Sequence, residues 1–471
     1  MSEALHVSPI YQHYPIQDFN GNPLIEALRP PACDPDEAIL RLVQKPPFAA
    51  EERELPPVYR SILPHRLVNF FFPQEHHVRL LQNIHIQLLD GYRKRNPMTA
   101  AGQRLLYSAG ERGAEVLKTP AKISFVTGMT GMGKSTAIRA ILKSLGSPVL
   151  KHSNYRGQPF PETQILYLMR NVSPRDSAKS VCRSLLEFCG ELLSTDNFLS
   201  IMKGNRTGAQ YVTLLKKIIA NYHVGMLVID EFQNLSLASS GGKAELLSMV
   251  INLRDELGVP IILVGNYKAA SLFRSDPSAA RRLIEGGFHE IKRPETHLAP
   301  EWKCFCEILW KYQWVREPKE LTEEIVEGLY DCCQGITGIA VNVFVKSQEE
   351  AILNGVESLT ASYIREIFVK HFVPIHGIVD ILSSNDPSVI SEYEDLYFSC
   401  INKFKFDPLQ EKINALSKVL NEKSQEQIAA INSPQKRKGT GKKAISGDIL
   451  KEFVLGGATT SELDEIMDAL S

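Results

Sequence analysis

The chain has 471 residues, of which 44% are hydrophobic and 23% charged, and its formal net charge is -1 at pH 7. This length allows two or three domains of about 150 residues each, so the chain is no small scaffold that depends on disulfide or metal staples. The near-neutral charge excludes a uniformly basic nucleic-acid-binding protein, and any DNA-binding surface must therefore be local.

Neither a leader sequence nor a membrane span is expected. The N-terminus lacks a basic region followed by an apolar run, and no segment approaches the roughly 18 apolar residues that span a membrane. We therefore expect a cytoplasmic protein. The cysteines lack zinc-ribbon spacing, and we expect reduced, buried thiols at Cys33, Cys182, Cys189, Cys304, Cys306, Cys332, Cys333 and Cys400.

Residues 1–60 form the first expected unit, an extended N-terminal arm. They are rich in proline and acid, as in RPPACDPDE, which favours an arm with short helices over a packed domain. Such an arm often lies on a neighbouring molecule. Residues 61 to about 117 then become helical, because apolar positions recur three and four apart in EHHVRLLQNIHIQLLDGYRKR.

The second expected unit spans residues 61–293 and joins this helical lead-in to alternating strands and helices. Strands are expected over KISFVT, TQILYLMR, VGMLVID, PIILVG and FHEIKR. Helices are expected from Lys134 and over SAKSVCRSLLEFCGELL and AELLSMVINLRDEL. Strands separated by helices predict an α/β fold whose core is a parallel sheet with helices on both faces.

Two further units follow in the chain. Residues 294–377 contain only helical patterns, from PEWKCFCEILWKYQW to ASYIREIFVKHF, and predict a small all-α lid domain. Residues 378–471 are polar and broken, with a basic run at 436–443 and a short amphipathic end, TTSELDEIMDALS. We expect a partly disordered C-terminal tail that binds a partner.

The stretch GMTGMGKS at 128–135 lies directly after an expected strand and directly before an expected helix, which is the context of a P-loop. In such a loop, backbone N–H groups close around phosphate oxygens, Lys134 bridges the β and γ phosphates and Ser135 ligates magnesium. We expect ATP and Mg2+ here, with Ser135 and Asp230 as metal ligands. The expected nucleotide-binding residues are Gly128, Thr130, Gly131, Met132, Gly133, Lys134, Ser135, Thr136 and Asp230.

The apolar strand in MLVIDEFQN ends in two adjacent carboxylates. Successive strand residues point in opposite directions, so Asp230 can face the magnesium shell while Glu231 reaches the attacking water as a general base. The alternative for Glu231 is a solvated acid at a strand end. The pair favours a hydrolysing ATPase over a nucleotide kinase, which usually needs no such base.

Two later positions complete the predicted catalytic set. Asn266 follows the strand PIILVG, where its amide can hydrogen-bond the γ phosphate or the water as the sensor of AAA+ proteins does; the alternative is a turn cap. Arg281 and Arg282 precede the last strand, where AAA+ proteins project an arginine finger into a neighbouring subunit. The alternative for this pair is two solvated arginines on a helix.

The flanks of these motifs carry a more specific signal. The segments NGNPLIEALRPP, GYRKRNP, VLKHSNYRGQPFPETQILYL, SPRDSAKSVC and QGITGIAVNVFVKSQEEAI together resemble the TnsC family, AAA+ regulators of heteromeric bacterial transposons. The resemblance covers residues from about 18 to about 370. Where many AAA+ lids carry a sensor arginine or lysine, this sequence has Asn342, with Lys346 one turn on, so the resemblance does not assign a second sensor.

The resemblance implies a fold, partners and an assembly. The expected fold is an AAA+ P-loop ATPase with a parallel sheet core, followed by the lid and the tail. The expected partners are double-stranded DNA, transposase subunits of the TnsA and TnsB type, and a target selector of the TnsD or TniQ type. The chain is expected to form a homo-oligomeric ring or filament on target DNA, where repetition multiplies weak phosphate contacts.

Two stretches beside expected strands supply candidate DNA contacts. Because no recognition helix is evident, we expect contacts to the DNA backbone without sequence choice. The alternative is that these are ordinary surface loops, with GYRKR and the basic run at 436–443 as rival contacts. The candidates are Lys151, His152, Tyr155, Arg156, Arg175 and Lys179.

Two other functions stay open at the level of sequence. One is an initiator or clamp-loader-like AAA+ ATPase that loads another DNA machine. The other is a P-loop small-molecule kinase, which would need neither DNA nor an oligomer for its activity.

Overall fold

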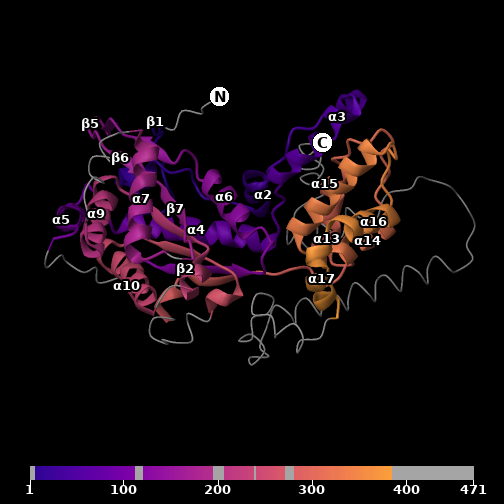
Figure 1. Ribbon diagram of the computed structural model, residues 1–471. Coiled ribbons are helices and arrows are strands. Elements are labelled where there is room, and N and C mark those ends of the chain that lie inside the picture. The colour runs from indigo at the N-terminus through magenta and orange to yellow at the C-terminus, as the bar shows by residue number, and fades with distance from the viewer. Residues whose placement is uncertain are drawn as a thin grey trace, which may run out of the picture.

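The computed structural model describes residues 6–111, 120–174, 176–194, 206–237, 240–270 and 281–384 (Figure 1). Four features of the sequence lie outside these ranges: Arg175, Cys400, the basic run at 436–443 and the amphipathic C-terminal end. Within the described ranges, no helix combines the length and apolar character that crossing a bilayer requires.

A five-stranded parallel sheet forms the centre of the molecule, as the alternating pattern predicts. Its strand order is β10-β2-β9-β8-β7, and every neighbouring pair is parallel. The three central strands β2, β9 and β8 are wholly buried, which suits apolar runs covered on both faces, whereas the edge strands β10 and β7 are only partly buried. Their bounds are β2 Ile123–Gly128, β7 Tyr167–Asn171, β8 Met226–Asp230, β9 Ile261–Val264 and β10 Gly287–Ile291.

Helices cover both faces of this sheet, which confirms the predicted α/β architecture. Alternate residues of one strand enter different cores: Leu227 and Ile229 face α7, α9 and α10, whereas Val228 faces α4 and α6. The helices are α4 Glu75–Arg93, α6 Lys134–Ser144, α7 Ala178–Leu193, α9 Gly208–Asn221 and α10 Ser240–Leu257, with α5 Ala100–Ser108 beside α9 and short 3-10 turns at η4 Phe232–Leu237 and η5 Tyr267–Ala270.

The expected single strand over TQILYLMR is in fact two strands in different sheets. β6 (Thr163–Ile165) pairs with β3 (Val149–Lys151), whereas β7 pairs with β8. Between them Leu166 donates its backbone N–H to the carbonyl of Pro148, so the chain changes partners at this residue. The small sheet is completed by β1 (His6–Val7), and a separate hairpin joins β4 Asn154–Tyr155 to β5 Gln158–Pro159.

A second, all-helical part follows the sheet, as the helical patterns after Pro294 predict. Its core is aromatic, with Trp302, Trp314 and Phe344 fully buried. The last helix extends beyond the expected boundary at 377, because Val379 and Leu382 are buried. The elements are α13 Pro300–Trp310, α14 Glu323–Cys333, α15 Thr337–Leu353, α16 Ala361–His371, η6 Val373–Ile375 and α17 His376–Ser383.

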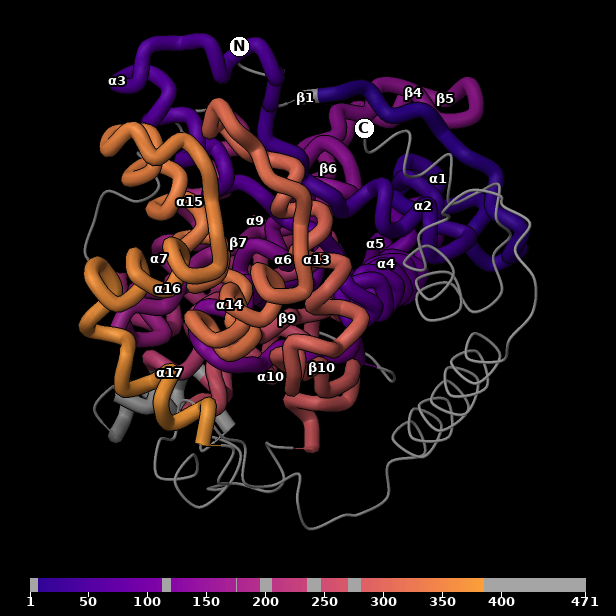
Figure 2. Tube along the Cα trace, turned by 90° about the vertical axis from the view of Figure 1, so that its right-hand side faces the viewer, coloured from indigo at the N-terminus to yellow at the C-terminus, as the bar shows by residue number. Residues whose placement is uncertain are grey.

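The N-terminal residues run along both parts of their own chain (Figure 2). Tyr14, Leu24 and Leu42 are buried in the core formed with α4 and α6, whereas Phe48 packs edge-on against Trp314 of the helical part. The elements of this stretch are η1 Gln17–Phe19, α1 Pro23–Glu26, α2 Pro35–Leu42, η2 Ala50–Glu54, α3 Pro57–Arg60 and η3 Leu63–Asn69.

A buried ion pair fastens α3 to the helical part. The side chain of Arg60 is 0% exposed and that of Glu357 is 16% exposed. Arg60 also donates to Glu357 Oε2 at 2.7 Å and to the carbonyl of Trp314 at 3.2 Å. A buried guanidinium without an opposite charge is strongly destabilising, so the stability of the fold depends on this ion pair.

Replacing Glu357 with glutamine is expected to lower the free energy of unfolding by about 3 kcal/mol, because Arg60 would stay buried without an opposite charge. Asp331→Asn is the matched control: it breaks the exposed pair with Arg365 and should cost roughly 0–1 kcal/mol. Urea unfolding followed by tryptophan fluorescence measures both, since all three tryptophans (Trp302, Trp310 and Trp314) lie in the helical part. Equal losses in the two variants would contradict the prediction.

The described cysteines are buried free thiols, as expected, with one exception. All seven described cysteines are free thiols, and six of them are buried. Cys33 is exposed in the loop before α2, so the expectation of a buried thiol is wrong there. Burial raises the pKa of Cys182 to about 12, which keeps this thiol protonated and unreactive.

Candidate nucleotide site

The P-loop leaves β2 through three glycines whose backbones lie in the left-handed half of conformational space. Gly128, Gly131 and Gly133 have φ angles of 153°, 86° and 77°. A Cβ atom at Gly128 would lie 2.5 Å from the carbonyl oxygen of Ile291, and one at Gly131 would lie 2.9 Å from the side chain of Ile336. Conformation and space therefore both require glycine at Gly128 and Gly131, whereas at Gly133 only the conformation does.

Lys134 begins α6 and turns its ammonium back into the loop. Its Nζ donates to the carbonyl oxygens of Gly128 at 2.9 Å and Met129 at 2.8 Å. The loop thus presents a cation next to the N-terminus of an eleven-residue helix. Both features favour an anion at this position.

The carboxyl ends of β8 and β9 bring the other predicted residues to the loop. Asp230 is the last residue of β8, and its Oδ1 accepts the backbone N–H of Glu231 at 2.8 Å. Its Oδ2 is buried and has no hydrogen-bond partner among the residues that the structure describes. A buried carboxylate oxygen without a partner is costly, and a cation at that point would remove the cost.

Glu231 leaves the strand in a left-handed conformation, with φ of 58°. Its carboxylate accepts a hydrogen bond from the side-chain amide of Gln233. Gln233 Oε1 in turn accepts the backbone N–H of Asn266 at 3.1 Å. One side chain therefore links the predicted base to the predicted sensor.

These residues enclose a cavity of about 140 Å³. Ligand pockets usually measure about 300 to 1,000 Å³, so this cavity accommodates the phosphate end of a nucleotide and not the whole molecule. Its lining residues are Thr130, Gly131, Gly133, Lys134, Ser135, Asp230, Glu231, Gln233, Gly265 and Asn266.

Three residues expected at the nucleotide do not line this cavity. Met132 is buried in the core, where its side chain packs against the sheet and α6, so that side chain is no nucleotide ligand. Gly128 and Thr136 are also absent from the lining, although Gly128 positions Lys134 through its carbonyl. Sequence reasoning missed Gln233 and Gly265, whose spacing matches no motif.

The site fits a magnesium ion. Mg2+ prefers hard oxygen ligands and usually takes one or two from the protein, with phosphates and waters supplying the rest. Ser135 and Asp230 both line the cavity, and Asp230 has the unpartnered oxygen. Among the described residues no cluster of three His, Cys, Asp or Glu side chains forms an all-protein metal cage, and an ion of this kind needs none.

The N-terminus of α15 abuts the P-loop from the helical part. Gly338 donates its backbone N–H to the carbonyl of Gly131 at 3.0 Å, and a Cβ at Gly338 would lie 2.7 Å from that oxygen. Farther along α15, Asn342 is exposed, and Lys346 lies 2.9 Å from each of two glutamates on its own helix. Neither residue lines the cavity.

The candidate arginine fingers lie away from the cavity of their own subunit. Arg281 is exposed. Arg282 is half-buried, and its carbonyl accepts a hydrogen bond from Arg254 at 3.2 Å. A role for either arginine in this chemistry would therefore require a second copy of the chain.

The candidate DNA contacts divide into exposed and buried residues. Lys151 is exposed at the end of β3, and Arg156 is exposed in the β4–β5 hairpin, where it pairs with Glu26 at 2.7 Å. Lys179 lies 5.9 Å above the ring of Tyr211. Arg175 lies outside the described residues.

His152 and Tyr155 are buried, so the expectation that their side chains face DNA is wrong. The Nδ1 of His152 lies 2.8 Å from the hydroxyl of Tyr11, and its Nε2 lies 3.0 Å from Gln164. Burial lowers the pKa of His152 to about 4, so the imidazole is neutral near pH 7 and offers no charge to a phosphate. Both residues hold the hairpin against the N-terminal stretch.

Residues of the rival basic stretch GYRKR make contacts within the chain itself. Arg95 is buried and donates to the carbonyls of Val224 at 2.6 Å and Gly225 at 3.1 Å. Lys94 pairs with Asp90 at 2.7 Å. This stretch fastens the end of α4 to the sheet.

Comparison with known proteins agrees with this geometry. The family model described as AAA domain matches residues 117–273. A search of curated proteins found no match.

Solved structures that resemble the chain do so at low identity. They include the Walker-type ATPase of Pyrococcus abyssi (14% identity, 64% of this chain and 84% of that one, TM-score 0.36) and the Aeropyrum pernix ORC2 protein (14%, 57% and 66%, 0.35). Drosophila ORC bound to DNA is a third (12%, 80% and 87%, 0.40). We draw no conclusion from likenesses at this level. The matched family and the parallel sheet around the P-loop show that this chain contains an AAA+ P-loop domain.

Proposed function

We propose that this chain is an ATP-hydrolysing AAA+ regulator that assembles on target DNA and links a target-selection protein to a transposase. The observation that carries the ATPase part is the single cavity shared by Lys134, Asp230 and Glu231. In this proposal the cavity offers a cation to the phosphates, a carboxylate oxygen to magnesium and a second carboxylate to the attacking water.

In this proposal the chain's own residues divide the work of hydrolysis. The P-loop amides and Lys134 bind the β and γ phosphates, and Ser135 and Asp230 would hold Mg2+, which would supply positive charge to neutralise the phosphate oxygens. Glu231 accepts the proton of the attacking water. Gln233 orients Glu231 and Asn266 relative to each other. Arg281 or Arg282 of an adjacent subunit supplies a further positive charge, which would make hydrolysis depend on assembly.

The proposal of a TnsC-type role rests on the segments that carry that resemblance, and contacts between three of them support it. Asn22, from NGNPLIEALRPP, donates to the carbonyl of Tyr92 in GYRKRNP at 2.9 Å. Gln164, from VLKHSNYRGQPFPETQILYL, donates to the carbonyl of Leu24 at 2.9 Å, and Arg156 of the same segment pairs with Glu26. Segments far apart in the chain thus form one packed unit beside the AAA+ sheet.

The experiment that tests the proposal is electron microscopy of the chain with ATP and duplex DNA. We expect rings or filaments on DNA that require both ATP and Mg2+, and ATPase activity that rises when DNA is present. A small-molecule kinase would show neither dependence. Particles that stay monomeric on DNA with ATP would contradict the proposal.

Replacing Lys151 and Arg156 together with glutamine is expected to weaken DNA binding and flatten its salt dependence. Two lost phosphate contacts lower the slope of log K against log salt by about 0.9 each. Binding measured between low and moderate salt gives this slope.

Glu26→Gln is the matched control for the DNA-binding variant. It removes the ion pair with Arg156 but keeps the cation, so it should leave the slope unchanged. If Glu26→Gln flattens the slope as much as the double variant does, the effect is structural and the assignment of these contacts is wrong.

A further inference from the structure

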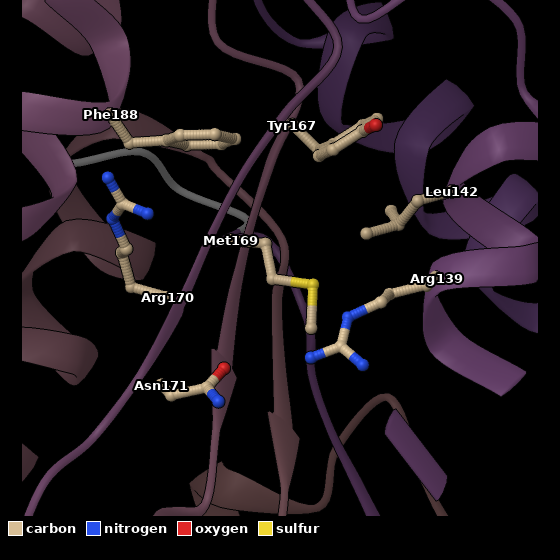
Figure 3. Close-up of a pocket in the computed structure, with 7 residues that line it drawn as sticks. All are labelled: Arg139, Leu142, Tyr167, Met169, Arg170, Asn171 and Phe188. Carbon is tan, nitrogen blue, oxygen red and sulfur yellow. The ribbon is translucent and has the colours of Figure 1, made fainter. Parts of the chain in front are cut away.

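A second, larger cavity lies at the free edge of the parallel sheet, next to the nucleotide site, since Asn171 in its lining is the register partner of Asp230. It measures about 510 Å³ and opens between α6 and α7 over strand β7. Figure 3 shows Arg139 and Leu142 on one side of it and Phe188 with Arg170 on the other. None of its lining residues also lines the nucleotide cavity.

The floor of this groove is an edge strand. β7 pairs with β8 on one side, and within the described residues no strand pairs with its other side. Folded proteins usually cover such an edge or pair it, because its open backbone groups attract other chains. The groove is therefore a place where a further segment would complete the fold.

The walls of the groove combine apolar surface with positive charge. Leu142, Tyr167, Met169 and Phe188 supply the apolar part. Arg139 is exposed, and the described part of the chain offers it no ion pair. A ligand that matches this groove carries apolar side chains together with carboxylates.

Arg170 adds a second cation whose present partner is weak. Its guanidinium lies 4.5 Å above the ring of Phe188 and 3.1 Å from the carboxylate of Glu191, and its Nε donates to the carbonyl of Ser184 at 3.0 Å. Glu191 is 62% exposed, so this pair contributes little and is open to exchange.

We propose that residues 461–470 of the chain itself, SELDEIMDAL, dock in this groove. The segment carries Glu462, Asp464, Glu465 and Asp468, and no lysine or arginine occurs from residue 452 to the end. Its apolar residues Leu463, Ile466, Met467 and Leu470 are spaced three and four apart, so a helical turn presents them on one face. The apolar residues of the segment match the apolar walls of the groove, and its acidic residues match Arg139 and Arg170.

The length of the chain permits this docking. Residues 385–460 separate the end of the described structure from the segment. A chain of this length can span up to roughly 250 Å when extended, at about 3.4 Å per residue, which is several times the width of a domain. The groove is therefore within reach from the end of α17.

A nucleic-acid backbone matches the groove less well than this segment. Phosphate contacts need cations and polar donors, whereas four of the seven lining residues are apolar or aromatic. DNA binding at the groove is nevertheless measured in the test below.

The test uses a fluorescent peptide of residues 459–471 and the full-length chain with its own acids neutralised by Glu462→Gln, Asp464→Asn, Glu465→Gln and Asp468→Asn. Fluorescence anisotropy should show saturable binding of the peptide. Adding Arg139→Glu should weaken it about tenfold or more, because an attractive contact becomes repulsive. Arg183→Glu is the control, since Arg183 is exposed on α7, pairs with Glu187 and does not line the groove.

A second measurement examines the chain without added peptide. Hydrogen exchange at 167–171 should be slower in the wild type than in the chain with neutralised acids. Three results would overturn the proposal: no peptide binding, equal binding by the Arg139→Glu variant, or an Arg139→Glu effect on duplex DNA binding alone, which would assign the groove to nucleic acid. Since the test needs neither ATP nor assembly, its outcome is independent of the proposed function.

Discussion

Replacing Glu231 with glutamine is expected to slow ATP hydrolysis by about 10² to 10⁴ while leaving ATP binding in place. The amide has the shape of the carboxylate and its oxygen can still accept the hydrogen bond from Gln233, but it cannot take a proton from water. Asp230, Lys134 and Ser135 are untouched, so the phosphates and Mg2+ keep their partners. Phosphate release and nucleotide titration measure the two quantities separately.

The same variant distinguishes a switch from an enzyme whose output is turnover. If ATP-bound molecules are the assembled ones, blocking hydrolysis holds the chain on DNA, because ATP shifts the equilibrium by its differential affinity for the two forms. Dissociation from labelled duplex after ATP loading should therefore be slower than for the wild type at the same salt concentration. A variant that leaves DNA as fast as the wild type, or never assembles, would rule out the switch.

Replacing Lys134 with alanine is expected to abolish ATP binding and, with it, ATP-dependent assembly on DNA. Lys134 is the one cationic side chain among the described residues that line the nucleotide cavity. Without it, Asp230 and Glu231 stand opposite the phosphates with no side-chain cation to offset them. Titration with a fluorescent ATP analogue, followed by microscopy with DNA, measures both losses.

Lys143→Ala is the control for this variant. Lys143 is exposed near the end of the same helix and does not line the cavity, so its loss should leave ATP affinity unchanged. Assembly of the Lys134→Ala variant on DNA with ATP would show that the P-loop is not the switch.

Sequence patterns correctly predict those parts of the molecule whose structure depends on residues close together in the chain. The P-loop requires glycines and a lysine at fixed spacing, and Gly131, Gly133 and Lys134 line the cavity, while Gly128 positions Lys134 through its carbonyl. The buried strand that ends in Asp230 is also predictable, because a short apolar run with a glycine before it and two carboxylates after it is typical of a buried strand.

Long-range packing decides the parts that the sequence did not predict. The division of TQILYLMR depends on the backbone of Pro148, and the burial of His152 depends on Tyr11 and Gln164. A polar loop that contains a histidine and a tyrosine has the composition of an exposed surface loop. Only the residues that pack against it in the fold show that it is buried. Gln233 shows the same limit, since its hydrogen bond with the backbone of Asn266, 33 positions later, follows from no motif.

The pairing of Arg60 with Glu357 has a consequence for how this protein is made. The two residues are 297 positions apart, and Tyr11 and His152 are 141 apart. At about 5–20 residues per second, a ribosome needs on the order of 15 to 60 seconds to add 297 residues. During that time Arg60 and Phe48 lack the helical part that finally buries them, including Trp314, whereas the stretch from Tyr14 to Leu42 packs on α4 and α6, which are made much earlier. The burial of Arg60 and Phe48 is therefore a late event in folding, and a nascent chain of this protein exposes apolar N-terminal surface that holding factors would have to protect.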